Sequence, residues 1–600
     1  MHYTSIENIH KVIDPLFLND LTSELNDILK IAVPRTRKNK LAEYQKQLAS
    51  LTFLDPACGS GNFLTETYLS LRRLENRAIQ AMYAGQMSFG EAINPIQVSI
   101  TQFHGIEIND FAVTVAKTAL WIAECQTMQE TEDILYMHLD FLPLKTNANI
   151  IEGNALNINW EKTVPKNELN YIMGNPPFVG NVQLSQSQKN DLDVLFNGKE
   201  GRLDYVSAWY VKTVEYIQNT HIRAAFVSTN SITQGIQVPT LWGFLKDKYH
   251  FHLDFAYQTF VWSSEALNKA AVHCVIIGFS YDDVYPKILF SKDSQKEVTG
   301  ISFYMTEGSD FIVYPRNAPL EDIPKMVRGN QPSDGGWLVL SKQEKEDILI
   351  HEPAAEKYIK QFMMGKEFIN GIERYCLWLE DISAKELNAL PMVKARVEKC
   401  KEARLKAPAK LTQSFAATPT LFGQRAAKFD GNYIALGRVS SQNRRYVPMN
   451  FLTQDVIAGD KLYIIPNGTI YMFGILMSNI HNSWMRMFAG RMKSDYSYST
   501  QMVYNTFPWP SPSNEQRVRI EQTAQGILNA RKIHPDWSLA DMYNPLTMPI
   551  ELQKAHIAND VAVMKAYGFD VKSMSETDCV AALMKMYQEK ISEINATTHK

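Results

Sequence analysis

Residues 171–180 read Tyr-Ile-Met-Gly-Asn-Pro-Pro-Phe-Val-Gly, an apolar, strand-like approach that runs into Asn175-Pro176-Pro177-Phe178. The Asn175 side-chain carbonyl is an acceptor, and Pro176 contributes a backbone carbonyl in a turn that the Pro-Pro step stiffens. Two such acceptors can take both hydrogens of an exocyclic amino group and leave the nitrogen lone pair free to attack an electrophile. Phe178 offers an aromatic face on which a base can stack, worth roughly 1–3 kcal/mol. The four residues alone are equally compatible with an ordinary Pro-rich turn and a core Phe.

A second motif lies upstream, where residues 51–61 read Leu-Thr-Phe-Leu-Asp-Pro-Ala-Cys-Gly-Ser-Gly. A short buried strand, a Gly-rich turn and a helical pattern follow one another here, as at the start of a doubly wound α/β sheet. Gly59 and Gly61 permit a ligand to approach the backbone closely. Asp55 stands at the carboxyl end of the strand, where such sheets bind ligands. The turn lacks the Lys of a phosphate-binding loop, so its acidic residue favours a cationic ligand.

Two further strands are expected after this turn. Residues 103–108 are expected to form a strand with an acidic residue, Glu107, near its end. A carboxylate at that point commonly holds the ribose hydroxyls of an adenosine-containing ligand. Residues 150–156 form the third strand and include Asn154, which is either a turn residue or a partner of the ligand's adenine amino group. The helix expected over 110–124 has an inward face made of Phe111, Val115, Ala119 and Ile122.

The composition bounds the class of protein. Six hundred residues are too many for one domain, and the hydrophobic share of 45% and charged share of 21% are ordinary for a globular protein. Six scattered cysteines without a C-x-x-C pair argue against a zinc site and a disulfide framework, so we expect no metal and a reducing cytosol. No apolar run approaches the ~18–20 residues of a membrane span, so no membrane partner is expected. The net charge of −3 requires any nucleic-acid-binding field to be local.

Together, these motifs resemble a known family. D-P-A-C-G-S-G at 55–61 and N-P-P-F at 175–178, preceded by H-Y-T-S at 2–5, are similar to the motifs of S-adenosylmethionine-dependent amino-group DNA methyltransferases of the gamma class. More narrowly, nearly the whole chain resembles the methyltransferase and target-recognition part of MmeI-like type IIG/IIL restriction–modification enzymes, which methylate adenine N6. The resemblance implies a Rossmann-like class I methyltransferase sheet, an α+β target-recognition domain and a C-terminal helical region.

The resemblance also implies the roles of individual residues. The catalytic motif would be Asn175, Pro176, Pro177 and Phe178. S-adenosylmethionine would be the cofactor, and its expected contacts are Tyr3, Thr4, Asp55, Pro56, Ala57, Cys58, Gly59, Gly61, Glu107, Ile108, Asn154 and Ala155. Tyr3, Thr4 and the turn would hold the methionine part, Glu107 the ribose and Asn154 the adenine edge. The family more often has Asp at that last position, and an amide accepts there without a charge.

Three domains are expected. Residues 1–285 form the methyltransferase domain, with a helical insertion over 66–98 as a lid or brace, and strands 255–260 and 271–279 close its sheet as an antiparallel hairpin. Residues 286–510 form the target-recognition domain, and residues 511–600 form a helical region.

The expected DNA contacts lie in the second half of the chain. Segment 394–410 carries seven Lys or Arg residues against two Glu, a net charge of +5, which is either a solvated helix face or a phosphate-tracking surface. Segments 437–446 and 481–498 resemble the family's recognition domain and supply Arg, Asn and Gln, which pair bidentately with base edges. The candidate DNA-binding residues are Lys394, Lys401, Arg438, Ser441, Arg444, Arg445, Arg491, Lys493 and Tyr496.

The expected function is therefore site-specific methylation of adenine N6 in double-stranded DNA by base flipping, in a restriction–modification or phage-defence system of a bacterial or phage-associated cytoplasm. Cytosine N4 is an alternative target, because its amino group presents the same hydrogens. Two further possibilities are an RNA or protein-glutamine N-methyltransferase and a non-catalytic DNA-binding protein. The family's nuclease lies upstream of H-Y-T-S, so we expect no DNA cleavage by this chain alone; a separate nuclease or defence-system subunit is a further candidate partner.

Overall fold

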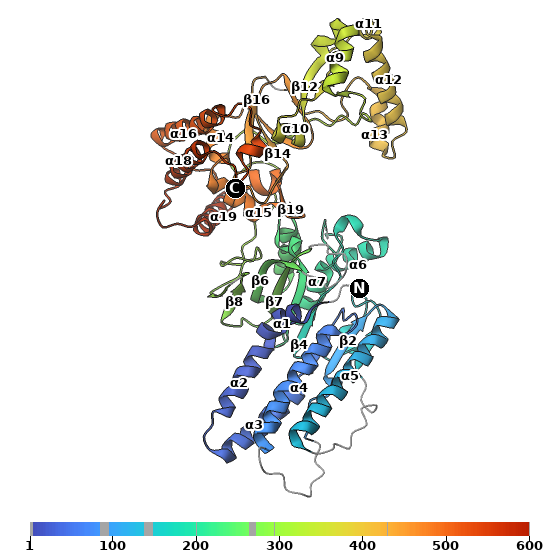
Figure 1. The fold of residues 1–600 in the computed structure, drawn as a ribbon, viewed down its shortest axis with the longest axis vertical. Coiled ribbons are helices and arrows are strands. Elements are labelled where there is room, and N and C mark those ends of the chain that lie inside the picture. Colours follow the sequence, from blue (N-terminus) through green and yellow to red (C-terminus); the bar gives the residue numbers. More distant parts are fainter. Residues whose placement is uncertain are drawn as a thin grey trace. The chain divides into compact units, whose positions relative to one another are not determined.

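The computed structural model describes residues 4–83, 95–136, 148–199, 201–262, 272–292, 294–428 and 430–598. Tyr3, one of the expected cofactor contacts, lies outside these residues. The chain divides into two compact units, Met1–Ile312 and Val313–Lys600, and each is described by itself (Figure 1). No helix in the described ranges is both long and apolar enough to cross a membrane.

A nine-stranded sheet organises the first unit, in the order β3-β2-β1-β4-β5-β7-β6-β8-β9. Strands β1 to β5 run parallel, and β7 is antiparallel to both of its neighbours, β5 and β6. The predicted α/β class is thereby confirmed. The bounds are β1 (Phe53–Asp55), β2 (Phe103–Glu107), β3 (Asn149–Glu152), β4 (Tyr171–Gly174), β5 (Arg223–Thr229), β6 (His252–Trp262), β7 (Val272–Ser280), β8 (Lys287–Phe290) and β9 (Gln295–Val298).

The β6–β7 pair is antiparallel as predicted, but it does not close the sheet. β8 pairs in parallel with the free edge of β6, and β9 pairs antiparallel with β8. Aromatic packing holds this extension, because the Tyr257 and Phe290 rings stack with centroids 4.2 Å apart. The domain end expected at residue 285 therefore falls inside the sheet, which reaches Val298.

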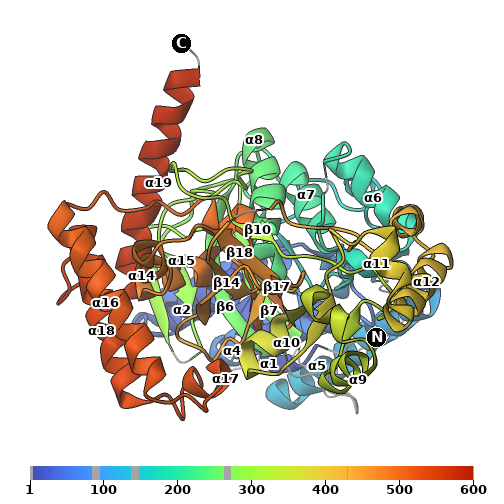
Figure 2. The same ribbon diagram turned by 90° about the horizontal axis from the view of Figure 1, so that it is seen from above.

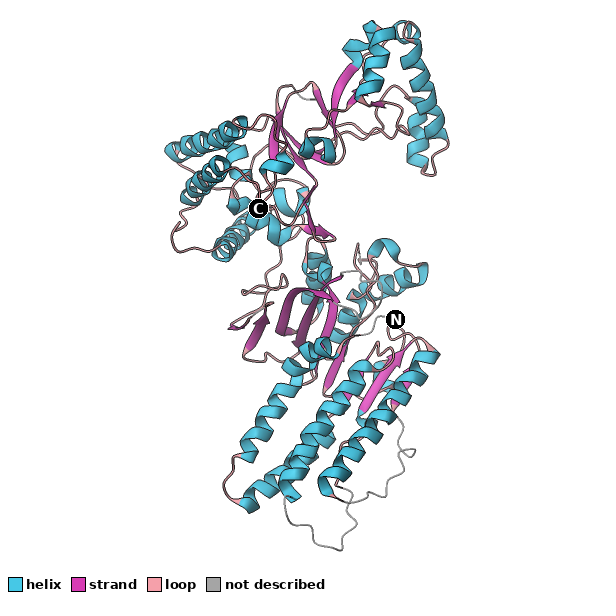
Figure 3. Cartoon of the chain, in the orientation of Figure 1, coloured by secondary structure: helices cyan, strands magenta, loops and turns pink. Residues whose placement is uncertain are grey.

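Helices flank this sheet, as Figure 3 shows in cyan against the magenta strands. Their bounds are α1 (Ile6–Ile13), α2 (Asn19–Leu29), α3 (Pro34–Ser50), α4 (Asn62–Tyr83), α5 (Asp110–Leu135), α6 (Gln186–Phe196), α7 (Ser207–Tyr216) and α8 (Phe244–Lys248). A π-helical turn, Asp14–Leu18, joins α1 to α2. α3, α4 and α5 lie side by side (Figure 1).

One sequence-based expectation about these helices is wrong, and the role of segment 66–98 as a lid or brace stays a prediction. The helix of that segment, α4, starts earlier than expected, at Asn62 directly after the glycine turn, and buries Leu64, Tyr68 and Leu71 in the core. Of the rest of that segment, residues 84–94 lie outside the described ones. The inward face of α5 is also different, because Phe111 and Ile122 are 70% and 55% exposed. The buried stripe consists of Ala112, Val113, Ala116, Leu120 and Ala123. Its small residues carry little hydrophobic signal in the sequence.

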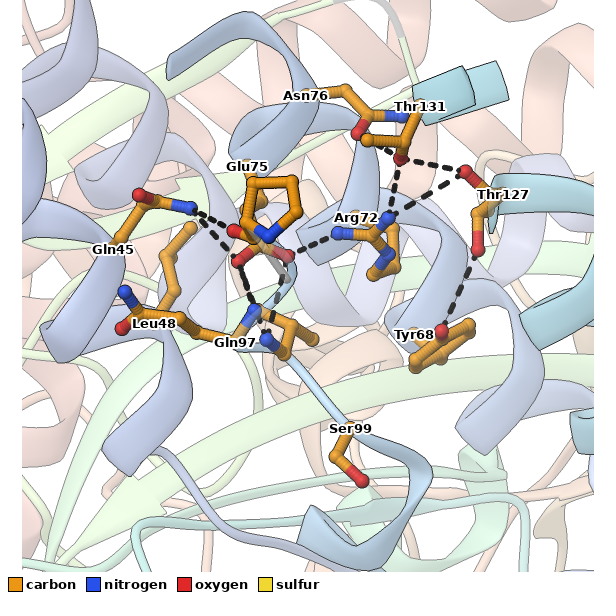
Figure 4. A network of polar contacts seen from close by, with 12 residues as sticks. Gln45, Leu48, Tyr68, Arg72, Glu75, Asn76, Gln97, Ser99, Thr127 and Thr131 are labelled. Carbon is orange, nitrogen blue, oxygen red and sulfur yellow. Dashed lines mark hydrogen bonds and ion pairs between the residues drawn. The ribbon is translucent and has the colours of Figure 1, made fainter. Parts of the chain in front are cut away.

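A buried polar network connects α3, α4 and α5 (Figure 4). Arg72 and Glu75 form an ion pair that is fully buried, and Arg72 also donates to Thr131 Oγ1 at 2.7 Å. Glu75 accepts the backbone N–H of Gln97 at 2.7 Å and the Gln45 amide at 3.1 Å. Further hydrogen bonds offset the cost of burying an ion pair. Those of Glu75 fix the strand approach at Gln97, whereas Arg72 Nε has no hydrogen-bond partner among the described residues.

The second unit is α+β and ends in helices, as predicted. Its three small sheets have the orders β10-β18-β14-β16, β11-β13-β12-β17 and β15-β20-β19. The strands are β10 (Val327–Arg328), β11 (Val339–Leu340), β12 (Ile359–Met363), β13 (Tyr375–Leu377), β14 (Tyr433–Gly437), β15 (Val439–Ser440), β16 (Met449–Leu452), β17 (Val456–Ala458), β18 (Leu462–Pro466), β19 (Gly490–Met492) and β20 (Asp495–Ser497).

The helices of the second unit are α9 (Lys342–His351), α10 (Gly365–Asn370), α11 (Ala384–Asn388), α12 (Pro391–Leu405), α13 (Lys410–Ser414), α14 (Ile470–Leu476), α15 (Asn479–Phe488), α16 (Asn514–Lys532), α17 (Leu539–Met542), α18 (Ile550–Ala566) and α19 (Glu576–Thr598). α16 and α18 lie side by side in both views (Figures 1 and 2). A buried hydrogen bond from Asn559 Nδ2 to the Gly474 carbonyl, 2.7 Å long, links α18 to α14.

Candidate active site

The first unit gathers polar residues at one edge of its sheet. Strands β1, β2, β3 and β4 are parallel neighbours, so their carboxyl ends meet at the same edge. Asp55 ends β1, Glu107 ends β2, and Asn175 directly follows β4. Asp55 lies tightly against the last of these strands, because a methyl group added at Gly174 would be 2.4 Å from Asp55 Oδ1. The two motifs found in the sequence are therefore in direct contact.

Hydrogen bonds join the glycine turn to β2. The Gly59 N–H donates to Glu107 Oε2 at 3.0 Å, and the Cys58 N–H donates to the Ile106 carbonyl at 3.1 Å. Gly59 has a positive φ of +55°, and at Gly61 (φ +83°) a side chain would meet Ala116 Cβ at 2.9 Å. Glycine is thus required at both positions, once for conformation and once also for space.

The Asp55 carboxyl is the central electrostatic feature of this edge. It is 1% exposed, and burial raises its pKa to about 8, with the nearby Glu107 acting in the same direction and a hydrogen bond from the Ala57 N–H opposing them. Burial, together with Asp55 and Glu107, also raises the pKa of the Cys58 thiol, which makes it a poor nucleophile. A buried carboxyl that is neutral for want of a counter-charge is suited to a cationic ligand.

The corner after β3 differs from the prediction. The strand ends at Glu152, so Asn154 lies two residues beyond it and Ala155 follows, buried. Asn154 Oδ1 accepts the Leu156 N–H at 3.0 Å, and its Nδ2 donates to Asp191 Oδ2 at 3.1 Å. The amide thus has partners within the protein at both ends, and a ligand would use the second lone pair of Oδ1.

The Asn175 amide is held by a hydrogen bond from its nitrogen, while its oxygen is left without one among the described residues. Its Nδ2 donates to the hydroxyl of buried Thr4 at 3.2 Å. Its Oδ1 is buried and has no hydrogen-bond partner among the described residues. Pro176 is buried, Pro177 is exposed, and the half-buried Phe178 ring packs against the core of the sheet. An unpaired buried carbonyl is costly, so this arrangement is suited to a donor that arrives with a ligand.

Asp204 supports the loop after Phe178, a role that the sequence did not reveal. Its Oδ1 accepts the Asn181 N–H at 3.2 Å, and its Oδ2 accepts the hydroxyls of Ser231 and Thr229. It thereby ties the loop after Phe178 to the end of β5. Asp204 is followed by α7, from which Trp209 Nε1 donates to the Pro56 carbonyl at 3.1 Å.

The basic segment 394–410 is less available than its charge suggested. Arg404, 1% exposed, donates to five backbone carbonyls, including those of Ser333 and Leu421. Arg396 pairs with Glu344 at 3.0 Å and also donates to two backbone carbonyls. Both are structural residues of the second unit. Of the two predicted DNA contacts on α12, Lys401 is exposed and Lys394 is half-buried.

The remaining predicted DNA contacts fall into two groups. Arg438 and Arg444 line one pocket, and Ser441 follows its β15 wall. Arg491, Lys493 and Tyr496 belong to the β19–β20 hairpin, in which the Arg491 guanidinium lies 3.9 Å above the Tyr496 ring. Arg445 stands apart from these groups, with its guanidinium 3.7 Å from the carboxylate of Glu576.

Comparisons with known proteins match this architecture along the chain. The MmeI DNA-methyltransferase domain model matches residues 32–291, the MmeI target recognition domain model matches 307–511, and the MmeI C-terminal domain model matches 512–595. The solved structure of the type IIL restriction-modification enzyme MmeI in complex with DNA is 41% identical, covers 98% of this chain and 79% of that one, and superposes with a TM-score of 0.90. This chain belongs to the MmeI family.

A curated member of similar closeness is DNA methyltransferase A of Bacillus subtilis (strain 168), 40% identical over 598 residues. That alignment covers 98% of this chain and 66% of the relative, so the chain spans just under two thirds of its length. A more distant relative, a putative type II restriction enzyme and methyltransferase of Methanocaldococcus jannaschii, is 25% identical over 28% of this chain and 14% of its own. The MmeI-family match covers both units described above.

Proposed function

We propose that the chain is a site-specific DNA methyltransferase of an MmeI-type restriction–modification system. In this proposal the first unit holds S-adenosylmethionine and the target base, and the second unit recognises the DNA sequence. The reaction transfers a methyl group to the N6 atom of an adenine flipped out of duplex DNA. The observation that carries the proposal is the buried Oδ1 of Asn175, which has no hydrogen-bond partner in the described part of the chain and lies at the strand edge that also holds Asp55.

The residues present fit S-adenosylmethionine, which supplies an electrophilic methyl group on a sulfonium when bound. The buried Asp55 carboxyl would balance its positive charge, and the turn at Gly59 and Gly61 admits the ligand to the backbone. Glu107 already accepts backbone N–H groups of Gly59 and Asn109, and its partial exposure leaves it accessible to ribose hydroxyls. Ile108 is exposed directly after it, in position to lie against an adenine ring.

Catalysis by this chain is mainly positioning. Asn175 Oδ1 and the Pro176 carbonyl accept the two amino hydrogens, which aims the nitrogen lone pair and stabilises the positive charge that develops on that nitrogen. Thr4 accepts from the amide nitrogen of Asn175, which would leave the amide oxygen for the base. Phe178 stacks on the flipped base and offsets part of the few kcal/mol that flipping costs. Asp204 is a positioning residue that keeps the loop in place.

The test is transfer of a tritiated methyl group from S-adenosylmethionine to unmethylated plasmid DNA, followed by nucleoside analysis. We expect label in N6-methyladenosine. Asn175→Ala should lose at least about 10²–10³-fold in kcat, the usual effect of removing one preorganised hydrogen-bonding group, while cofactor affinity is kept. Asn190→Ala is the matched control, because Asn190 is exposed on α6 and should leave the rate unchanged.

Different results would change specific parts of the proposal. Label in N4-methylcytosine would keep the mechanism and change the target base. No label in DNA with the cofactor still bound would exclude DNA as the substrate and direct attention to RNA or protein amino groups.

A further inference from the structure

A pocket of about 410 Å³ lies in the second unit, where three segments far apart in the sequence meet. They are α10 with Lys366, the turn between β14 and β15 with Arg438, and Lys461 before β18. Arg444, after β15, completes the wall. The sequence pattern pointed to Arg438 and Arg444 as readers of bases and did not single out the two lysines.

The charged side chains that line this pocket are all basic. They are Lys366, Arg438, Arg444 and Lys461, and none of the described Asp or Glu residues lines it. Within the described part of the chain, the Arg444 guanidinium and the Lys366 ammonium have no hydrogen-bond or ion-pair partner. Half-burial lowers the pKa of Arg444, and Asp495 opposes this shift only in part. Arginines in folded proteins are normally paired when they are partly buried.

Two carboxylates lie near the pocket, and neither neutralises it. Asp460 pairs with Arg328 at 2.6 Å and with Lys461 at 3.3 Å, so one negative charge faces two cations. The Asp460 carbonyl also accepts from Arg438 at 3.2 Å. Asp495 acts on Arg444 only at a distance and is itself bonded to the Gln442 N–H at 3.2 Å. The local field therefore remains positive.

Polar and apolar groups of the wall also point to a particular ligand. The Ser440 hydroxyl and the Arg438 Nε–H are buried without hydrogen-bond partners among the described residues. Three apolar residues, Phe368, Val447 and Pro448, line the same pocket. An anion with an attached apolar body matches this combination better than a bare ion does.

We propose that this pocket holds one sugar–phosphate unit of the DNA backbone. Arg444, Lys461 and Lys366 contact the non-bridging phosphate oxygens, and Val447 and Pro448 lie against the deoxyribose. The proposal rests on DNA being the substrate. It changes the role of Arg444 from base reading to backbone positioning, because phosphate contacts fix the register of a protein on DNA without carrying sequence information.

The experiment measures binding of the full chain to a 40-base-pair unmethylated duplex by fluorescence anisotropy over a range of salt concentrations. The variants are Arg444→Gln, Lys461→Gln and their double. Lys554→Gln, at an exposed position of α18, is the control for the removal of one positive charge. Removing one phosphate interaction should reduce the slope of log K against log salt by about 1, so the double variant should show a reduction of about 2. Affinity should fall by the same factor for an unmethylated duplex that carries the site identified by the methyl-transfer assay and for the same duplex with one base of that site changed.

Three outcomes would overturn the assignment. An unchanged slope would exclude a phosphate contact. Loss of discrimination between the target site and the changed site would show base reading by these residues. Stabilisation of the wild type by inorganic phosphate at constant ionic strength, absent from the double variant whose DNA binding is normal, would show a free-anion site.

Methyl transfer by the same preparations separates this proposal from the previous one. A wild type that neither binds nor methylates duplex DNA would overturn the proposed function itself. A wild type that does both, with variants that match it in slope, would overturn the pocket assignment alone.

Discussion

The Asp55 carboxyl is buried beside Glu107, and both conditions disfavour its ionised form. With a pKa of about 8 it is mostly protonated at pH 7. A bound cation would favour the ionised form of Asp55, so binding of one cofactor molecule should release about one proton at pH 7. Isothermal titration calorimetry in two buffers of different ionisation enthalpy measures this release. Asp55→Asn should abolish it, and equal release by that variant would assign the proton to another group.

The same pKa has a consequence for stability. The pKa of Asp55 is raised in the folded state, so its contribution to stability is complete below its ordinary pKa of 3.8 and is lost as the pH rises through about 8. The free energy of unfolding should therefore fall less between pH 5 and pH 9 in Asp55→Asn than in the wild type. Urea unfolding of both proteins at the two pH values measures the difference.

Residues that belong to short motifs could be predicted from the sequence, whereas residues that act through folding could not. Asp55, Glu107 and Asn175 stand directly at strand ends, so their convergence follows from the parallel sheet. Asp204 acts through Asn181 and the end of β5, which are 23 and 25 residues away, and no local pattern links them. Asn154 was predicted to serve a ligand, and its bond to Asp191 on α6 is equally invisible in the sequence.

The helix α12 carries both buried and exposed basic residues, which the sequence alone does not distinguish. Arg404→Met should lower the free energy of unfolding by about 3 kcal/mol or more, because five backbone carbonyls lose the donor that the buried guanidinium supplies. Lys401→Met, on the exposed side of the same helix, should change it by less than about 0.5 kcal/mol. Urea unfolding followed by tryptophan fluorescence compares the two. Equal effects would show that the Arg404 bonds contribute little.

The elements that were predicted well carry a strong periodic or turn signal, and the others do not. The strands β1, β4, β6 and β7 coincide with apolar runs in the sequence, and glycine or proline lies in or beside most of these runs. The buried face of α5 mixes alanines and threonines with few large apolar residues, so larger but exposed residues such as Phe111 dominated the pattern. β8 and β9 are four residues long and partly polar, and only the pairing of β8 with β6 and of β9 with β8 identifies them as part of the sheet.

Each of the two units has its own core, and every described residue proposed to hold the cofactor belongs to the first. A chain of residues 1–312 should therefore bind S-adenosylmethionine with an affinity within about threefold of the full chain. It should transfer no methyl group to duplex DNA, because the proposed recognition residues all lie in the second unit. Equilibrium dialysis and the tritium assay measure the two properties. Site-specific methylation by residues 1–312 would place recognition in the first unit instead.

Gly174 has a consequence for how the two substrates affect each other. Its α-carbon is the wall between the Asp55 carboxyl and the backbone that carries Asn175, and no side chain could be accommodated there. A shift of the carboxylate on meeting a cation would therefore act directly on the backbone next to Asn175, the residue proposed to hold the base. Binding of the methyl donor at Asp55 and binding of the base at Asn175 would then be coupled through the α-carbon of Gly174. Binding of the donor would alter the affinity of the protein for the base.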